Sequence, residues 1–284
     1  MDSPFTKETQ KNSVDFRTYS ISWNLTKRCN LNCEHCYLDA DFRGGIRNDE
    51  LSTAECFRVV DQIAEVNPNA FLILTGGEPL LRPDIYDIVR YASDKKFMVV
   101  LGTNGTIINR GVAEKIKASG AHGVGISIDS MIASKHNRFR GVELAWENSM
   151  KAFHALNEVG VDFLIQMSVS DMNYKEIPDV VKFSEKIGAL AFNLYFLVCT
   201  GRGQGNTDIS NVAYEEALKT LYKLQMEYKG RLMINSKCAP QYKRVVYEND
   251  PDSVYQRTYS GGCPAANHYC RISPEGNLTP CPFI

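Results

Sequence analysis

Short apolar segments alternate six times with amphipathic segments of helix length, and no other feature of the sequence constrains the fold as much. We expect strands at residues 19–25, 71–74, 97–101, 123–128, 163–169 and 192–198. We expect the helices between them at residues 52–67, 83–95, 111–119, 144–158 and 177–187. Strands that are apolar throughout are typical of a parallel sheet covered by helices. Because β/α crossovers are right-handed, six such units predict an α/β fold, a partial (β/α)6 barrel.

Local signals support the first predicted helix and show that the β/α alternation stops in the last part of the chain. Ser52 and Glu55 have the spacing of a capping box, which predicts a helix beginning there. Residues 212–228 predict one more helix, and the chain from residue 230 is irregular and rich in Cys, Pro and Gly. We therefore divide the chain into an N-terminal extension (1–18), a barrel (19–229) and a cysteine-rich region (230–284). Because the sequence stops just after Cys281 with no closing element, we expect the natural C-terminus to lie beyond residue 284.

Composition excludes several classes of protein. A net charge of -1, from 32 basic and 33 acidic residues, argues against a nucleic-acid binder. No apolar run approaches the roughly 20 residues that span a bilayer. The polar residues 1–18 lack the apolar stretch of a signal peptide, so we expect a cytoplasmic protein that does not bind membranes. In that reducing compartment, clusters among nine cysteines indicate metal ligands before disulfides.

The first cysteine cluster follows the first predicted strand. Cys29, Cys33 and Cys36 have the spacing C-x3-C-x2-C. Three thiolates on one loop can hold three corners of a [4Fe-4S] cluster and leave the fourth iron open, as a catalytic zinc keeps an open position. The alternative is a zinc knuckle, which would need His35 or a distant cysteine as its fourth ligand.

This triad, followed by Tyr37, resembles that of the radical S-adenosylmethionine (SAM) enzymes. The resemblance implies that the open iron binds the amino and carboxylate groups of SAM. It also implies that an electron from the cluster cleaves SAM to methionine and a 5′-deoxyadenosyl radical, which abstracts hydrogen from a substrate. One residue departs from the family pattern: His35 stands where an aromatic residue is usual. Imidazole is flat enough to pack in the same place.

A second motif follows the second strand. Gly76, Gly77, Glu78 and Pro79 are similar to the GGEP motif of the family, which implies that they hold the amino group of SAM. Adjacent glycines let backbone approach a ligand, and a glutamate can accept a hydrogen bond from an ammonium group. The alternative is a plain glycine turn before a helix.

Further polar residues end the later strands, where ligands of β/α barrels bind. By family similarity Asn104, Ser127 and Asp129 lie near the ribose or methionine part of SAM or near substrate, although such residues are also ordinary in turns. The stretch from His136 to Gly141 resembles the HDxxRG stretch of related members. Arg140 within it is expected either to pair with a carboxylate, such as that of SAM, or to lie in a solvated basic loop.

The second cysteine cluster lies near the end of the sequence. Cys263, Cys270 and Cys281 resemble ligands in the SPASM or twitch extensions of radical SAM enzymes, which implies an auxiliary iron–sulfur cluster. Residues 273–277 predict a hairpin turn between Cys270 and Cys281. The fourth ligand is expected beyond residue 284, at Cys238, or from outside the protein. The alternative is three free structural thiols, which we disfavour because a Gly- and Pro-rich segment offers no core to pack in. Cys56, inside a predicted helix, is expected in the core.

The substrate is less constrained. Residues 195–203 and 270–277 look most like members that trim the side chains of tetrapyrroles in haem biosynthesis, and Arg202 could meet a propionate there. Gln166 and Cys199 are further candidates for substrate contact, although Cys199 could be an ordinary buried thiol. The alternatives are a maturase of ribosomal peptides or protein side chains and, in another class, a non-catalytic zinc or iron–sulfur scaffold. Reduced ferredoxin or flavodoxin is the expected electron donor.

Overall fold

Parallel strands in sequence order form the centre of the computed structural model, which describes residues 20–45, 47–204, 209–253 and 263–284. The N-terminal extension (1–18) lies outside these residues. The six predicted strands are all present, as β1 Ser20–Asn24, β4 Phe71–Thr75, β5 Met98–Thr103, β6 Gly123–Ser127, β7 Phe163–Val169 and β8 Ala191–Phe196. Each pairs in parallel with the next.

Three further strands extend this sheet at its two edges. The strands β9 Met233–Lys237, β10 Tyr269–Ile272 and β11 Leu278–Thr279 give the order β11-β10-β1-β4-β5-β6-β7-β8-β9. β9 pairs in parallel with β8, and β10 pairs in parallel with β1. The region after residue 229 therefore adds strands to the same sheet. The sequence had predicted a hairpin around residues 273–277 and irregular chain elsewhere in this region. The division of the chain at residue 229 remains a prediction.

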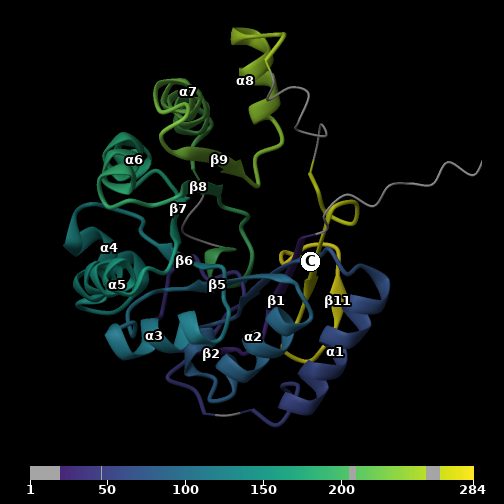
Figure 1. Ribbon diagram of the computed structural model, residues 1–284. Coiled ribbons are helices and arrows are strands. Elements are labelled where there is room, and N and C mark those ends of the chain that lie inside the picture. The colour runs from purple at the N-terminus through teal and green to yellow at the C-terminus, as the bar shows by residue number, and fades with distance from the viewer. Residues whose placement is uncertain (1–19, 46, 205–208, 254–262) are drawn as a thin grey trace, which may run out of the picture.

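The helices lie around the outside of the strands (Figure 1). They are α1 Thr53–Val66, α2 Ile85–Asp94, α3 Arg110–Ala118, α5 Ala145–Val159, α6 Ile177–Lys186 and α7 Asn211–Glu227. α1 begins as predicted, because Ser52 accepts from the backbone of Glu55 while the Glu55 carboxylate accepts from the backbone of Ser52. No helix among the described residues is long and apolar enough to cross a membrane.

Two helices were not predicted. These are α4 Ala133–Arg140 and α8 Tyr242–Asn249. α4 replaces the solvated basic loop that we had considered for this stretch, because His136, Phe139 and Arg140 are buried on one side of the helix. Short 3-10 turns, η1 Pro79–Leu81, η2 Tyr174–Glu176 and η3 Gly201–Gln204, follow β4, β7 and β8.

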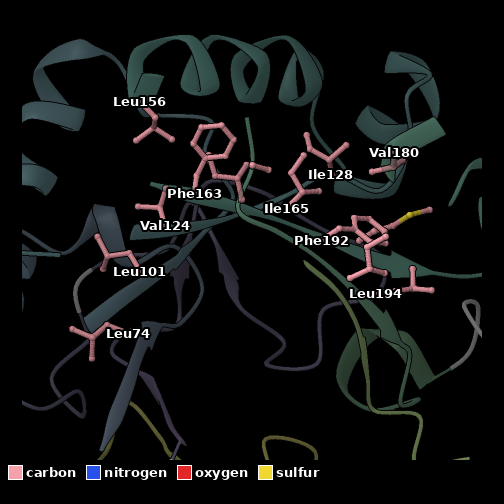
Figure 2. Close-up of a cluster of buried hydrophobic side chains, with 14 of the residues drawn as sticks. Leu74, Leu101, Val124, Ile128, Leu156, Phe163, Ile165, Val180, Phe192 and Leu194 are labelled. Carbon is pink, nitrogen blue, oxygen red and sulfur yellow. The ribbon is translucent and has the colours of Figure 1, made fainter. Parts of the chain in front are cut away.

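The main core lies between the sheet and its helices, and Figure 2 shows part of it. Along β7 the buried side chains alternate, with Phe163, Ile165, Met167 and Val169 in the core. The alternate positions of the strands are half-buried and largely polar, and we call the side of the sheet that they form the inner face. The period of two residues along a strand therefore separates an apolar, helix-covered face from a polar one.

Candidate functional site: the first cysteine cluster and its surroundings

The three cysteines of the first cluster lie on the loop that follows β1. A two-residue strand, β2 Arg28–Cys29, pairs with β3 Asp41–Phe42 and closes this loop. Each thiol sulfur accepts a hydrogen bond. The donors are Leu31 N–H to Cys29 Sγ (3.4 Å), Ala40 N–H to Cys36 Sγ (3.4 Å) and Arg140 Nη1 to Cys33 Sγ (3.8 Å). Donors directed at all three sulfurs suit thiolate ligands, whose negative charge such bonds stabilise.

Burial disfavours the thiolate form of two of these cysteines when no metal is bound. Burial raises the pKa of Cys29 to about 12, and burial also raises the pKa of Cys33. A metal must therefore displace their protons when it binds. The described residues contain no group of three or more Cys, His, Asp or Glu side chains placed to hold a single metal ion. A four-iron cluster holds its thiolates further apart than one ion does.

Arg140 connects the cluster loop to the ends of β6 and β7. Its Nε donates to Asp129 Oδ2 at 2.6 Å, and Asp129 Oδ1 accepts from Ser168 N–H at 3.0 Å. Burial alone would raise the pKa of Asp129, but the Arg140 guanidinium and the neighbouring imidazoles lower it overall. Asp129 and Arg140 thus neutralise each other. The carboxylate that pairs with Arg140 is that of Asp129, where we had considered the carboxylate of SAM or a solvated loop.

Arg202 also has partners inside the protein. Its Nε donates to Cys33 O, and its Nη1 donates to Ala40 O (2.8 Å) and Asp39 Oδ1 (2.9 Å). A side chain on Gly201 would lie 2.4 Å from Cys36 O, so η3 packs directly against the cysteine loop. Arg202 therefore holds the cysteine loop by hydrogen bonds, whereas we had considered it for a substrate propionate.

Glu78 is a buried carboxylate that has only uncharged donors. It accepts from Thr103 Oγ1 (2.7 Å), Asn104 N–H (2.8 Å) and Leu80 N–H (3.1 Å). Burial raises the pKa of Glu78 to about 7, and these hydrogen bonds oppose the shift. No cation is among the groups that act on this pKa. A buried carboxylate of this kind gains most from a cationic ligand such as an ammonium group.

Gly76 and Gly77 bring this glutamate up against the chain that leads to the cysteines. Gly77 N–H donates to Thr26 O at 2.7 Å. A Cβ atom on Gly77 would lie 2.3 Å from Arg28 O, and one on Gly76 would lie 2.5 Å from Thr26 O. The glycines therefore permit close packing between two backbone segments, in addition to any approach to a ligand. Pro79 is buried at the start of η1, which Glu78 caps.

Asn104 directly follows β5, and Gln166 lies within β7, two strands away in the sheet. The Nδ2 of Asn104 donates to Asn30 Oδ1 at 2.8 Å, which ties the end of β5 to the cysteine loop. Gln166 lies in register with Ser127 on the inner face, and its Nε2 would lie 2.9 Å from a Cβ on Gly125. The missing side chain of Gly125 therefore makes room for Gln166 on that face.

The aromatic residues of the loop pack in two directions. His35 stacks on Phe139, with ring centroids 4.1 Å apart, so an imidazole does fill the usual aromatic position. Its Nδ1 is buried without a hydrogen bond to any described residue. Tyr37 accepts from Asn24 Nδ2 at 2.9 Å and meets Phe283 edge to face.

The cysteines of the second set differ in burial: Cys270 is buried, Cys281 is half-buried, and Cys238 and Cys263 are exposed. Cys270 packs in the main core beside its strand neighbour Ile21, so this thiol does have a core to pack in. Cys238 directly follows β9 and has a φ of 59°. The surrounding protein atoms raise the pKa of Cys238 to about 11, and the thiols of Cys281 and Cys263 add to that shift. Cys238 thus lies within electrostatic range of Cys263 and Cys281, while Cys270 packs in the core.

The remaining predicted features have mixed outcomes. The hairpin turn is confirmed, because Ser273 N–H donates to Asn277 O between the antiparallel strands β10 and β11. Cys56 is fully buried in the core, as expected. Cys199 is exposed, so its interpretation as a buried thiol was wrong.

The fold and this cysteine site define a SAM-dependent iron–sulfur enzyme. The chain belongs to the radical SAM superfamily, which it matches over residues 23–184. The AdoMet-dependent heme synthase of Methanosarcina barkeri is 35% identical over 272 residues, which cover 93% of this chain and 76% of the relative. The pre-heme d1 synthase of Dinoroseobacter shibae is 32% identical over 241 residues, which cover 83% of this chain and 56% of that relative.

A solved structure confirms the predicted fold class. The crystal structure of Streptococcus suis SuiB bound to S-adenosylmethionine matches with a TM-score of 0.73 at 18% identity, covering 94% of this chain and 60% of that chain. Membership in the family implies a [4Fe-4S] cluster and SAM as cofactors, and it identifies the protein as an enzyme. The interpretation as a non-catalytic scaffold was therefore wrong.

Several residues that shape the site were not predicted. Asn30 and Thr103 bind the motif residues, while Lys237 and Arg271 lie on the inner face. Asn30 lies within the C-x3-C spacer, and a polar residue there was a usable signal. The sequence around Arg271 gave no such signal, because nothing local shows that β10 pairs with β1.

Proposed function

We propose that this enzyme uses SAM to generate a radical that modifies the side chains of a tetrapyrrole in haem biosynthesis. The observation that carries the cofactor part is the pairing of three hydrogen-bonded thiols with a buried, uncompensated carboxylate at one end of the sheet. The substrate part is supported by the similarity to the AdoMet-dependent heme synthase, which extends over 93% of this chain.

In this proposal each site residue has a defined task. Cys29, Cys33 and Cys36 ligate the cluster, and Glu78 accepts a hydrogen bond from the ammonium group of SAM. The bound cluster and SAM supply the electron and the 5′-deoxyadenosyl radical. Ser127 faces the nucleoside from the inner face, where it lies in register with Gln166.

The other motif residues hold the site in shape. Asn104 fixes the cysteine loop through Asn30, and Asp129 fixes Arg140 against Cys33. We therefore assign Asn104, Asp129 and Arg140 to positioning. Tyr37 anchors the end of the loop to Asn24 on β1.

An auxiliary cluster is the second part of the proposal. We assign Cys238, Cys263 and Cys281 as its ligands, because the thiols of Cys263 and Cys281 both contribute to the raised pKa of Cys238 while Cys270 lies in the core. A fourth ligand comes from outside the described residues or from a bound molecule. Reduced ferredoxin or flavodoxin supplies electrons in the cytoplasm.

The test is an anaerobic assay with reconstituted protein, a reductant, SAM and an iron coproporphyrin. We expect release of 5′-deoxyadenosine together with a product that has lost carboxylated side-chain mass. Release of 5′-deoxyadenosine without any change in the porphyrin would exclude the tetrapyrrole substrate but keep the radical chemistry. A modified peptide formed from a precursor in the same assay would support a maturase instead.

A further inference from the structure

The inner face of the sheet carries an unusual distribution of charge. None of the nine strands, as described, contains Asp or Glu, and their only charged residues are Lys237 on β9 and Arg271 on β10. A surface that carries two positive charges and no carboxylate attracts anions.

Both cations lie on the inner face and not in the core. In β9 the residue Ile234 packs in the core, and Lys237 is three positions later, on the opposite face. In β10 the residues Cys270 and Ile272 pack in the core, and Arg271 lies between them. Both cationic side chains are half-buried, so a ligand on the inner face can reach them.

Neither cation has an acidic partner in the part of the chain that the structure describes. Arg271 donates from Nε to the neutral oxygen of Asn24 at 2.6 Å, and this side chain in turn donates to Tyr37 OH. Among the residues that the structure describes, no carboxylate pairs with either of them. A half-buried, unpaired cation is a favourable partner for a ligand carboxylate.

The surface between the cations is neutral and polar. Ser127, Gln166, Asn193 and Asn235 lie side by side in register on four neighbouring strands, and Asn235 Nδ2 donates to Asn193 Oδ1. Such a row offers hydrogen bonds without adding charge.

Aromatic rings line the same region. Tyr195 lies in register with Lys237, and Tyr269 precedes Arg271. Tyr37 and Arg271 share one partner, because Asn24 donates to Tyr37 OH and accepts from Arg271 Nε. Three tyrosines offer flat faces to a ring system.

We propose that Lys237 and Arg271 are the carboxylate-binding residues of the substrate site, which takes a flat molecule bearing at least two separated carboxylates. This inference rests on the proposed function and assigns to Lys237 and Arg271 the role that we had considered for Arg202. A propionate-bearing tetrapyrrole has the required shape and charge. One propionate binds at β9 and another at β10, and the macrocycle lies against the tyrosines.

The test measures binding without turnover. Iron coproporphyrin III is titrated into reconstituted protein without reductant, and its Soret absorbance gives a dissociation constant. We expect Lys237→Gln and Arg271→Gln each to weaken binding about tenfold or more, since each removes one charge-assisted contact. We expect the tetramethyl ester to bind the wild-type protein more weakly by a similar factor. Lys223→Gln, an exposed lysine on α7, is the matched control and should bind as wild type does.

The charge-conserving variants Lys237→Arg and Arg271→Lys guard against misfolding, because they should recover most of the affinity if charge is what matters. Unchanged binding in both glutamine variants would overturn this inference and leave the proposed function standing. Equal affinity of the wild-type protein for iron coproporphyrin III and for its tetramethyl ester would also overturn this inference and leave the proposed function standing. A wild-type protein that cleaves SAM but binds no porphyrin would overturn the tetrapyrrole substrate itself.

Discussion

Arg140 bonds to Asp129 through Nε at 2.6 Å and to the sulfur of Cys33 through Nη1 at 3.8 Å. This one side chain therefore joins α4 to the end of β6 and to the cysteine loop. Because both Arg140 and Asp129 are buried, each depends on the other for its charge to be tolerated. These bonds attach the cysteine loop to the strands of the barrel.

Replacing Arg140 with Gln should destabilise the protein by about 3–5 kcal/mol, because Asp129 would keep a buried charge without a partner. Anaerobic urea denaturation measures the free energy of unfolding. Arg138→Gln is the control on the same helix, since its side chain is 81% exposed, and it should change stability by less than about 0.5 kcal/mol. Equal stability of the two variants would show that the buried pair contributes nothing.

Glu78 should make stability fall as pH rises when SAM is absent. Its pKa is raised from 4.5 to about 7 in the folded state, so the folded protein favours the neutral acid. This stabilisation is complete below pH 4.5 and is lost as pH rises through about 7. Glu78→Gln should therefore be less destabilising at pH 8 than at pH 5, by about 3 kcal/mol.

The measurement is the difference in unfolding free energy between wild type and Glu78→Gln across this pH range. Saturating SAM should reduce the dependence, because an ammonium group near the carboxylate lowers its pKa. A pH-independent difference would contradict the raised pKa of Glu78.

Gly77→Ala should destabilise the protein by about 3 kcal/mol and slow SAM cleavage. The new Cβ would lie 2.3 Å from the carbonyl oxygen of Arg28, which is backbone and cannot easily move. Gly111→Ala is the opposite control: its Cβ meets nothing closer than 3.5 Å, and in a helix alanine should stabilise by about 0.5–1 kcal/mol. Thermal unfolding and 5′-deoxyadenosine release check both, and a tolerated Gly77→Ala would argue against the tight packing at Arg28.

Replacing Cys29, Cys33 or Cys36 with Ala should abolish SAM cleavage, because each change removes one corner ligand of the cluster. Cys56→Ala is the control: it empties space in the core and should lower stability while leaving iron bound. Iron analysis and electron paramagnetic resonance of the reduced proteins separate the two effects. Normal SAM cleavage in a triad variant would disprove the ligand assignment.

Cys238→Ser and Cys281→Ser should each lower the iron content, because each removes a proposed ligand of the auxiliary cluster. The thiols of Cys281 and Cys263 both contribute to the raised pKa of Cys238. Cys270→Val should keep the iron content, since valine suits the apolar surroundings of Ile21 and Ile272. Iron and sulfide analysis after anaerobic reconstitution distinguishes these variants. Iron loss confined to Cys270→Val would return this cysteine to the ligand set.

Local sequence signals predicted the elements whose own residues carry a clear pattern. The range 163–169 is β7 to the residue, and Ser52 caps α1 as its spacing with Glu55 predicted. α4 was not predicted, because its sequence is polar and only the packing of Phe139, His136 and Arg140 against the cysteine loop makes it a helix.

The candidate site divides in the same way. The spacing of the three cysteines and the Gly-Gly-Glu sequence predict the cofactor site, because each motif lies within a few residues of the chain. Arg202 was considered for substrate contact. In the structure it donates hydrogen bonds to the carbonyl oxygens of Cys33 and Ala40. Each of these residues is more than 160 positions away in the chain, so no local pattern encodes the contacts.

The sequence by itself determined the β/α alternation, the helix cap and the ligand spacing, since each depends on neighbours along the chain. Only the tertiary structure decided which face each strand residue occupies, because a strand has two faces and its partner selects the buried one. The pairing of β10 with β1 directs Cys270 into the core and Arg271 to the inner face. The pairing of β9 with β8 likewise aligns Lys237 with Tyr195.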